Sequence, residues 1–202
     1  MNNTHPLIPA TAVKGIASGM VMMAAFTTIW AILAYNGLSN NPARFALVIF
    51  PILSLVFLIN ALKLFRMAKY YPPLTSEADI AEEKRVGKWF GIIFGAEGLG
   101  IFIAINIVIN LGHPELTMPV IALVVGLHFY PLAKVFKRTI DYYLATWSTL
   151  IAVLAIVFSL NKTLTQNGVF TLLGVGIALA TASYGTYMML SGWKIPKTAE
   201  QL

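Results

Sequence analysis

Six runs of about 20 apolar residues dominate this sequence and constrain its fold more than any other feature. A helix of that length crosses the roughly 30 Å hydrocarbon core of a bilayer. Of the 202 residues, 58% are hydrophobic and only 11% are charged, whereas about a quarter of a typical soluble chain is charged. The runs predict an all-α integral membrane bundle of six transmembrane helices, at about residues 15–35, 45–65, 86–108, 117–134, 140–160 and 168–190.

The polar segments between these runs are too short to bury cores of their own, so residues 1–202 are predicted to form a single membrane domain. The first run is long for a signal peptide and no clear small-x-small cleavage site follows it, so we expect it to be retained. The chain has no cysteine, which excludes disulfides, thiolate metal sites and thiol nucleophiles. The composition also argues against a cytosolic enzyme, a secreted domain and a disordered interaction protein.

The basic residues predict the orientation of the bundle. Of the 14 Lys and Arg residues, all but Arg44 and Lys162 fall on one side of the six predicted spans. Positive charge accumulates in cytoplasmic loops, so we expect both termini to be cytoplasmic and the protein to lie in the cell membrane. The pI of about 9.6 then comes from these basic residues, and we expect their partners to be anionic lipid headgroups on the cytoplasmic side, not nucleic acid. The residues on the basic side are Lys14, Lys63, Arg66, Lys69, Lys84, Arg85, Lys88, Lys134, Lys137, Arg138, Lys194 and Lys197.

The longest polar segment connects the second and third spans. Pro72 and Pro73 end any helix that continues from the second span. Ser76 stands three residues before Asp79, the spacing of a capping box. We therefore expect a cytoplasmic helix to begin at about Glu77 and to run into the third span.

Small residues at helical spacing predict where helices approach closely, because association in lipid depends on packing. The fifth and sixth spans carry such stripes and follow each other through a short loop, so we expect these two stripes to face each other. The third span carries a glycine stripe that lies more than about 100° around the helix from Glu97. We therefore expect the third span to be a central helix with contacts on two sides. The predicted packing residues are Gly91, Gly95, Gly98, Ala152, Gly174, Ala178 and Gly185.

Two ionisable residues are expected inside the membrane. Glu97 lies nine residues beyond Lys88, about 13 Å into the bilayer at the rise of a helix, and His128 lies about 9 Å from the cytoplasmic end of the fourth span. Ionisable groups at such depths are candidates for functional sites. The two side chains could pair, either as a proton- or solute-binding site or as an interhelical tie. Asn60, Asn106 and Tyr184 are further candidates to line the same site.

Several chemistries lack their sequence signals. The spans contain too few histidines for bis-histidine haem, and no zinc, nucleotide-binding or nucleophile-elbow motif is present. We therefore predict no metal and no cofactor, and the chain favours a role other than catalysis.

The stretch Gly126-Leu127-His128-Phe129-Tyr130-Pro131-Leu132-Ala133 resembles a motif of small multi-pass bacterial membrane proteins that have no assigned activity. The resemblance implies a bacterial cell membrane and no particular substrate.

Three functions remain open at this stage. The first is a small-solute or proton-coupled transporter with a polar site between the third and fourth spans. Glycines and a proline, here Gly95 to Gly100 and Pro131, often interrupt helices near such sites. The second is a structural or regulatory membrane protein that binds a partner through residues 69–88. The third, least favoured, is an intramembrane enzyme. A homodimer is compatible with the small size of the chain.

Overall fold

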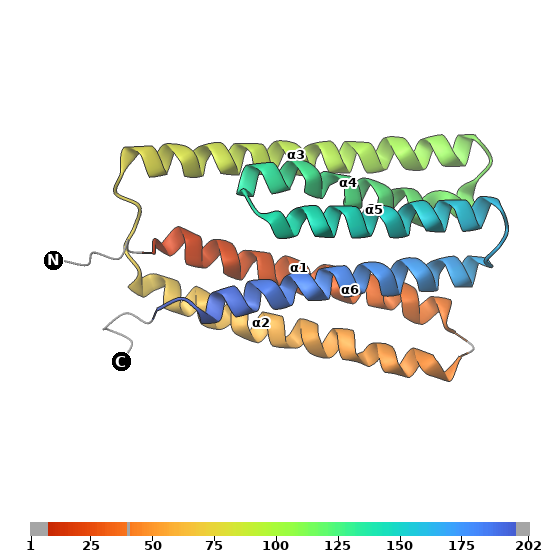
Figure 1. The fold of residues 1–202 in the computed structure, drawn as a ribbon, viewed down its shortest axis with the longest axis horizontal. Helices are drawn as coiled ribbons and strands as arrows, with labels where there is room; N and C mark the ends of the chain where they lie inside the picture. Colours follow the sequence, from red (N-terminus) through yellow and green to blue (C-terminus); the bar gives the residue numbers. More distant parts are fainter. Residues whose placement is uncertain (1–7, 40, 197–202) are drawn as a thin grey trace.

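The computed structural model describes residues 8–39 and 41–196, and the described residues form helices joined by short connections (Figure 1). Six of the helices are long and apolar enough to cross a membrane, which confirms the predicted all-helical class and agrees with the six predicted apolar helices. Lys197 lies outside the described residues. In order, the elements are α1 (Ala10–Gly37), η1 (Pro42–Val48), α2 (Ile49–Met67), η2 (Ala68–Tyr70), α3 (Glu77–Asn110), η3 (Pro114–Leu116), α4 (Thr117–Phe136), α5 (Thr139–Leu160) and α6 (Gln166–Trp193).

The helix predicted after Pro72 and Pro73 begins at Glu77, as expected. Ser76 occupies the N-cap position in extended conformation, but its side chain accepts no hydrogen bond, so the predicted capping box does not form. The first turn of α3 is exposed, and water can satisfy its free N–H groups there.

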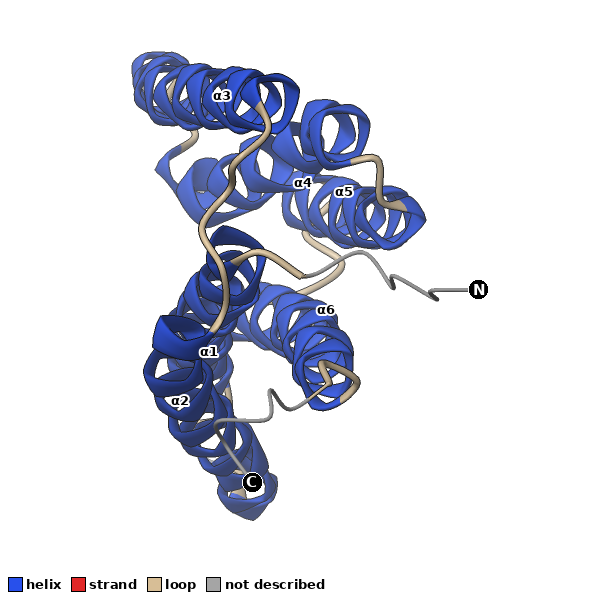
Figure 2. Cartoon of the chain, turned by 90° about the vertical axis from the view of Figure 1, so that its left-hand side faces the viewer, coloured by secondary structure: helices blue, strands red, loops and turns tan. Residues whose placement is uncertain are grey.

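The six long helices form two groups of three, α1 with α2 and α6, and α4 with α3 and α5 (Figure 2). Contacts between α5 and α6 join the groups, and Trp147 Nε1 of α5 donates a 2.8 Å hydrogen bond to the carbonyl oxygen of Gly176 in α6. We call the end where α1 begins and α6 finishes the basic end. The α2–α3 connection and the α4–α5 turn lie at this end as well (Figure 1).

The small residues of α6 pack against α1 and α2, which corrects the prediction that they face α5. A Cβ at Gly174 would lie 2.6 Å from the carbonyl oxygen of Trp30, and Gly185 lies against the ring of Phe57. Thr27 of α1 donates a buried 2.9 Å hydrogen bond to Thr181 of α6. The reason is that α1 has its own buried small face, which permits a closer approach than α5 does. That face consists of Ala17, Ala24, Ala31 and Ala34.

The small face of α5 packs instead against α4. A Cβ at Gly126 would lie 2.8 Å from the backbone nitrogen of Thr149 and 3.1 Å from the carbonyl carbon of Ser148. Ala152 and Ala178 are both fully buried in the core cluster that α1, α5 and α6 share. Adjacency in sequence therefore made α5 and α6 neighbours without making their small faces partners.

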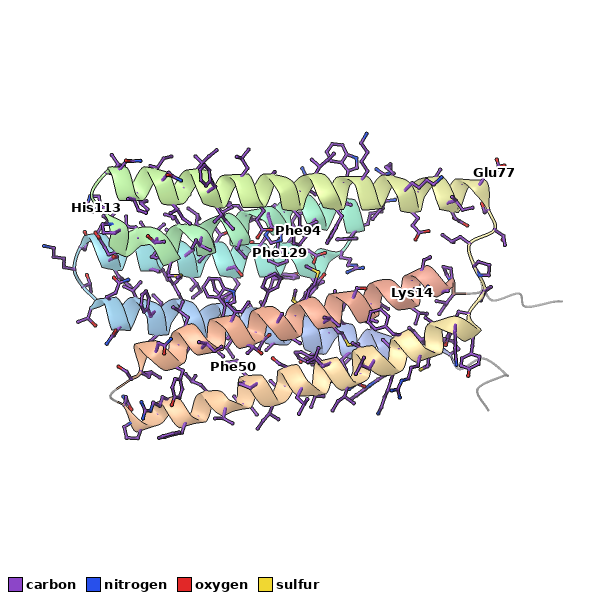
Figure 3. All side chains as sticks on the ribbon, turned by 180° about the vertical axis from the view of Figure 1, so that it is seen from behind. Lys14, Phe50, Glu77, Phe94, His113 and Phe129 are labelled. Carbon is purple, nitrogen blue, oxygen red and sulfur yellow. The ribbon has the colours of Figure 1, made fainter. Side chains whose placement is uncertain are left out.

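Helix α3 lies at the edge of the bundle, which corrects the prediction of a central helix. It packs on α4, and Ile93 and Val108 are its buried residues. A Cβ added at Gly91, Gly95 or Gly98 would meet nothing within 4 Å in the described part of the chain. The glycine stripe points away from α4 because Glu97 and its neighbours occupy the inward face. Figure 3 shows the length of this edge helix, with Glu77 and His113 near opposite ends of the bundle.

Candidate functional site

Glu97 and His128 come together on the inward face of α3. Glu97 Oε1 lies 3.5 Å from His128 Nδ1, and both side chains are at least nine-tenths buried. The ring of Phe94 meets the imidazole edge-on at a centroid distance of 5.5 Å. His128 Nδ1 has no hydrogen-bond partner in the described residues, so the contact is an electrostatic one without good hydrogen-bond geometry. The depth calculation from the sequence thus brought together two groups that are neighbours in space.

His128 also lines a central cavity of about 220 Å³ between the two groups of helices. Phe94 and Phe129, which line it, lie midway along the bundle (Figure 3). Most of its wall is apolar, and its polar side chains include His128, Arg138, Asp141 and Tyr184. Residues from α1, α3, α4, α5 and α6 contribute to it, so the cavity belongs to the interface between the groups. The contact between Glu97 and His128, where the sequence predicts a polar site, lies between α3 and α4, and His128 also lines this cavity.

The cavity continues towards the basic end. A second, wider hollow of about 780 Å³ lies there, between the start of α1, the connection 72–75 and the first turns of α3. The two hollows share Gly15, Phe136 and Arg138 as lining residues. The wider hollow also contains carboxylates of α3, among them Asp79 and Glu82. The wider hollow, which we call the vestibule, therefore adjoins the central cavity on the side of the basic end.

Arg138, Asp141 and Tyr184 form a polar cluster on the cavity wall. Arg138 Nη1 donates a 3.2 Å hydrogen bond to the hydroxyl of Tyr184, and its guanidinium lies 4.7 Å from the centre of the Phe136 ring. Asp141 is only 1% exposed, and its Oδ2 accepts no hydrogen bond within the described residues. A buried carboxylate oxygen without a partner is costly and calls for an explanation in function.

Reasoning from sequence missed Arg138 and Asp141 because both were placed at the membrane boundary. The α4–α5 turn lies well short of the end of α3 (Figure 1), and in the first turn of α5 Asp141 is buried while Thr139 and Tyr142 are exposed. The available signal is the difference in helix length. Arg138 and Asp141 lie at the start of α5, which has only 22 residues, whereas α3 has 34.

The other predicted site residues lie apart from one another. Tyr184 lines the central cavity with His128. Asn60 donates to the carbonyl oxygen of Val56 at 2.9 Å and accepts a 3.0 Å hydrogen bond from Trp193, and thereby links α2 to α6. Asn106 is exposed and donates to the carbonyl oxygen of Phe102 in its own helix. Neither asparagine joins the cavity.

No protein-family model matches this chain, and no curated protein and no solved structure matches it. The described residues contain no group of three or more His, Asp or Glu side chains that could hold a metal ion. The site is thus defined by its own geometry alone.

Proposed function

We propose that the protein is a small-solute transporter whose binding site is the central cavity. The observation that carries the proposal is the cavity between two helix groups, which adjoins the vestibule at the basic end and is lined by a buried carboxylate with an unpartnered oxygen. Transporter sites typically lie at the interface of two helix groups, where one group moves against the other. A structural core would be expected to satisfy such an oxygen.

The pair of Glu97 and His128 is suited to coupling the solute to a proton. His128 both lines the cavity and contacts Glu97. A change in the charge of the His128 imidazole would therefore act both on the cavity and on the carboxyl group of Glu97. We include proton coupling in the proposal as the role of this pair.

We further propose that the basic end faces the cytoplasm of a cell membrane and contacts anionic headgroups. The support is the distribution of positive charge, since among the described Lys and Arg residues only Arg44 and Lys162 lie at the opposite end. The vestibule would then open to the cytoplasm.

Labelling of single cysteines tests transport directly, and the natural chain offers no competing thiol. Ser18 lines the cavity and is exposed, so Ser18→Cys in proteoliposomes should react with a membrane-impermeant thiol reagent. Alternating access predicts reaction when the reagent is added from either side. Ser148→Cys, which replaces a 1% exposed residue packed on α4, is the protected control. Leu99→Cys, on the lipid face of α3, is the control for reaction within the bilayer.

The interaction-protein alternative predicts a different pattern. If Glu97 and His128 only tie α3 to α4, the cavity needs no access from the opposite end. Reaction of Ser18→Cys from the basic side alone, or from neither side, would contradict transport and favour that alternative.

A further inference from the structure

The Arg138–Asp141–Tyr184 cluster leaves both a hydrogen-bond acceptor and hydrogen-bond donors unused in one cavity. Asp141 Oδ2 has no donor, and a guanidinium has five donors, of which Arg138 uses one in a hydrogen bond to Tyr184 within the described residues. No ion pair joins Arg138 to Asp141 at 4 Å or less in the described part of the chain. The cavity therefore presents a negative acceptor and a positive donor that do not neutralise each other by direct contact.

The rest of the cavity wall is apolar and rich in aromatic rings and thioethers. These side chains come from α1, α3, α4 and α6 and face the cluster from several sides. Such surfaces favour a flat or branched hydrocarbon group, and methionines adapt to its shape. A volume of about 220 Å³ is below the roughly 300 Å³ at which drug-sized sites begin, so the occupant is small. The main apolar residues are Phe26, Phe90, Phe94, Phe129, Met22 and Met188.

We propose that this cavity binds a small zwitterion with an apolar side group, the chemistry of a free aromatic or aliphatic α-amino acid. Its ammonium group pairs with Asp141, its carboxylate pairs with Arg138, and its side group lies against the phenylalanines and methionines. A simple amine would pair with Asp141 and leave Arg138 without a counterion, and a simple acid would pair with Arg138 and leave Asp141 without one. Each arrangement leaves one charged group of the cavity uncompensated. This inference rests on the proposed function, because it identifies the solute of the same cavity.

Binding of three related probes to the full chain in detergent micelles, measured by isothermal titration calorimetry, tests the inference. Phenylalanine carries both charges, phenethylamine carries only the amine, and 3-phenylpropionate carries only the carboxylate. We expect phenylalanine to bind, with a Kd at least tenfold lower than that of either analogue. Asp141→Asn and Arg138→Gln should each raise the Kd for phenylalanine at least tenfold. Arg85→Gln, at an exposed arginine paired with Glu82, is the matched control and should leave the Kd unchanged.

If Asp141→Asn or Arg138→Gln fails to fold, a second variant still tests the inference. Ser18→Phe adds a ring to the cavity from α1 and leaves Arg138 and Asp141 in place, and it should abolish binding of phenylalanine. Binding that survives this substitution would place the ligand elsewhere and overturn the inference.

The outcomes separate the solute class from transport itself. Tighter binding of phenethylamine than of phenylalanine would identify an organic-cation site and overturn the zwitterion. The absence of binding by all three probes, together with reaction of Ser18→Cys from both sides, would overturn the zwitterion and leave transport standing. The absence of both binding and reaction would overturn both proposals.

Discussion

Helices α3 and α6 carry the same sequence signal and meet opposite surroundings. Both are apolar enough to cross a membrane and both have glycines at helical spacing. In the most apolar stretch of α6, 61% of the residues are buried, whereas the corresponding share in α3 is 11%. Gly174 touches the backbone of α1, but a Cβ at Gly95 would meet open space. Glycine spacing therefore shows that a face can be approached closely, and only the fold shows whether anything approaches it.

The largest expected effect on stability comes from adding a side chain where α1 and α6 pack closely. Gly174→Val should destabilise the protein by about 3 kcal/mol or more, because the new side chain would overlap the backbone of Trp30 and Ala34 and neither helix can yield locally. Thermal unfolding in detergent, with the yield of monodisperse protein, measures the loss. A variant that melts like the natural chain would show that the two helices are not in close contact.

Substitutions on the inward face of α3 should lower the stability of the protein more than substitutions on its glycine face. Glu97→Ala removes the buried partner of His128 and should cost about 2 kcal/mol. Glu97→Gln retains most of the shape and polarity and should cost less. Leu99→Ala, on the exposed face of the same helix, is the matched control. Equal melting temperatures for Glu97→Ala and Leu99→Ala would mean that the ionisable pair contributes nothing to the attachment of α3.

A smaller effect is expected where the two helix groups meet. Trp147→Phe removes the donor to the carbonyl oxygen of Gly176 while it keeps an aromatic ring. Interhelical hydrogen bonds in membranes contribute about 0.6 kcal/mol on average, so we expect a loss of about 0.5–1 kcal/mol. Equilibrium unfolding in a denaturing detergent can resolve this difference. Trp89→Phe on exposed α3, where the structure shows no such hydrogen bond among the described residues, should leave stability unchanged.

The smallest effect is expected on the glycine face of α3. Gly95→Ala should change stability by less than about 1 kcal/mol, and in the stabilising direction, because the site has room for the methyl group and alanine favours a helix. Melting temperatures of Gly95→Ala and Gly174→Ala, measured side by side, give the comparison in its sharpest form. Strong destabilisation by Gly95→Ala would reveal a neighbour on α3, and particle mass in detergent would then show whether that neighbour is a second copy.

The sequence predicted the helices better than their partners. Apolar runs set the number of spans, and Pro72 and Pro73 marked the connection before Glu77, because these signals are local. The proximity of Glu97 and His128 followed from depth, which a helix converts into residue number. The pairing of α6 with α1 depends on which small faces fit, and distant residues such as Ala34 decide that. Asp141 was missed because its depth depends on the lengths of the surrounding helices.

We propose that the carboxyl group of Asp141 serves a solute and not the fold, and the stability of Asp141→Asn tests this most directly. A carboxylate oxygen that is buried without a partner is unfavourable in the empty protein, and an amide removes that charge. We predict that purified Asp141→Asn elutes as a single species and melts at or above the temperature of the natural chain in the absence of solute. A melting temperature far below that of the natural chain would show that Asp141 holds the helices together, and it would contradict the account.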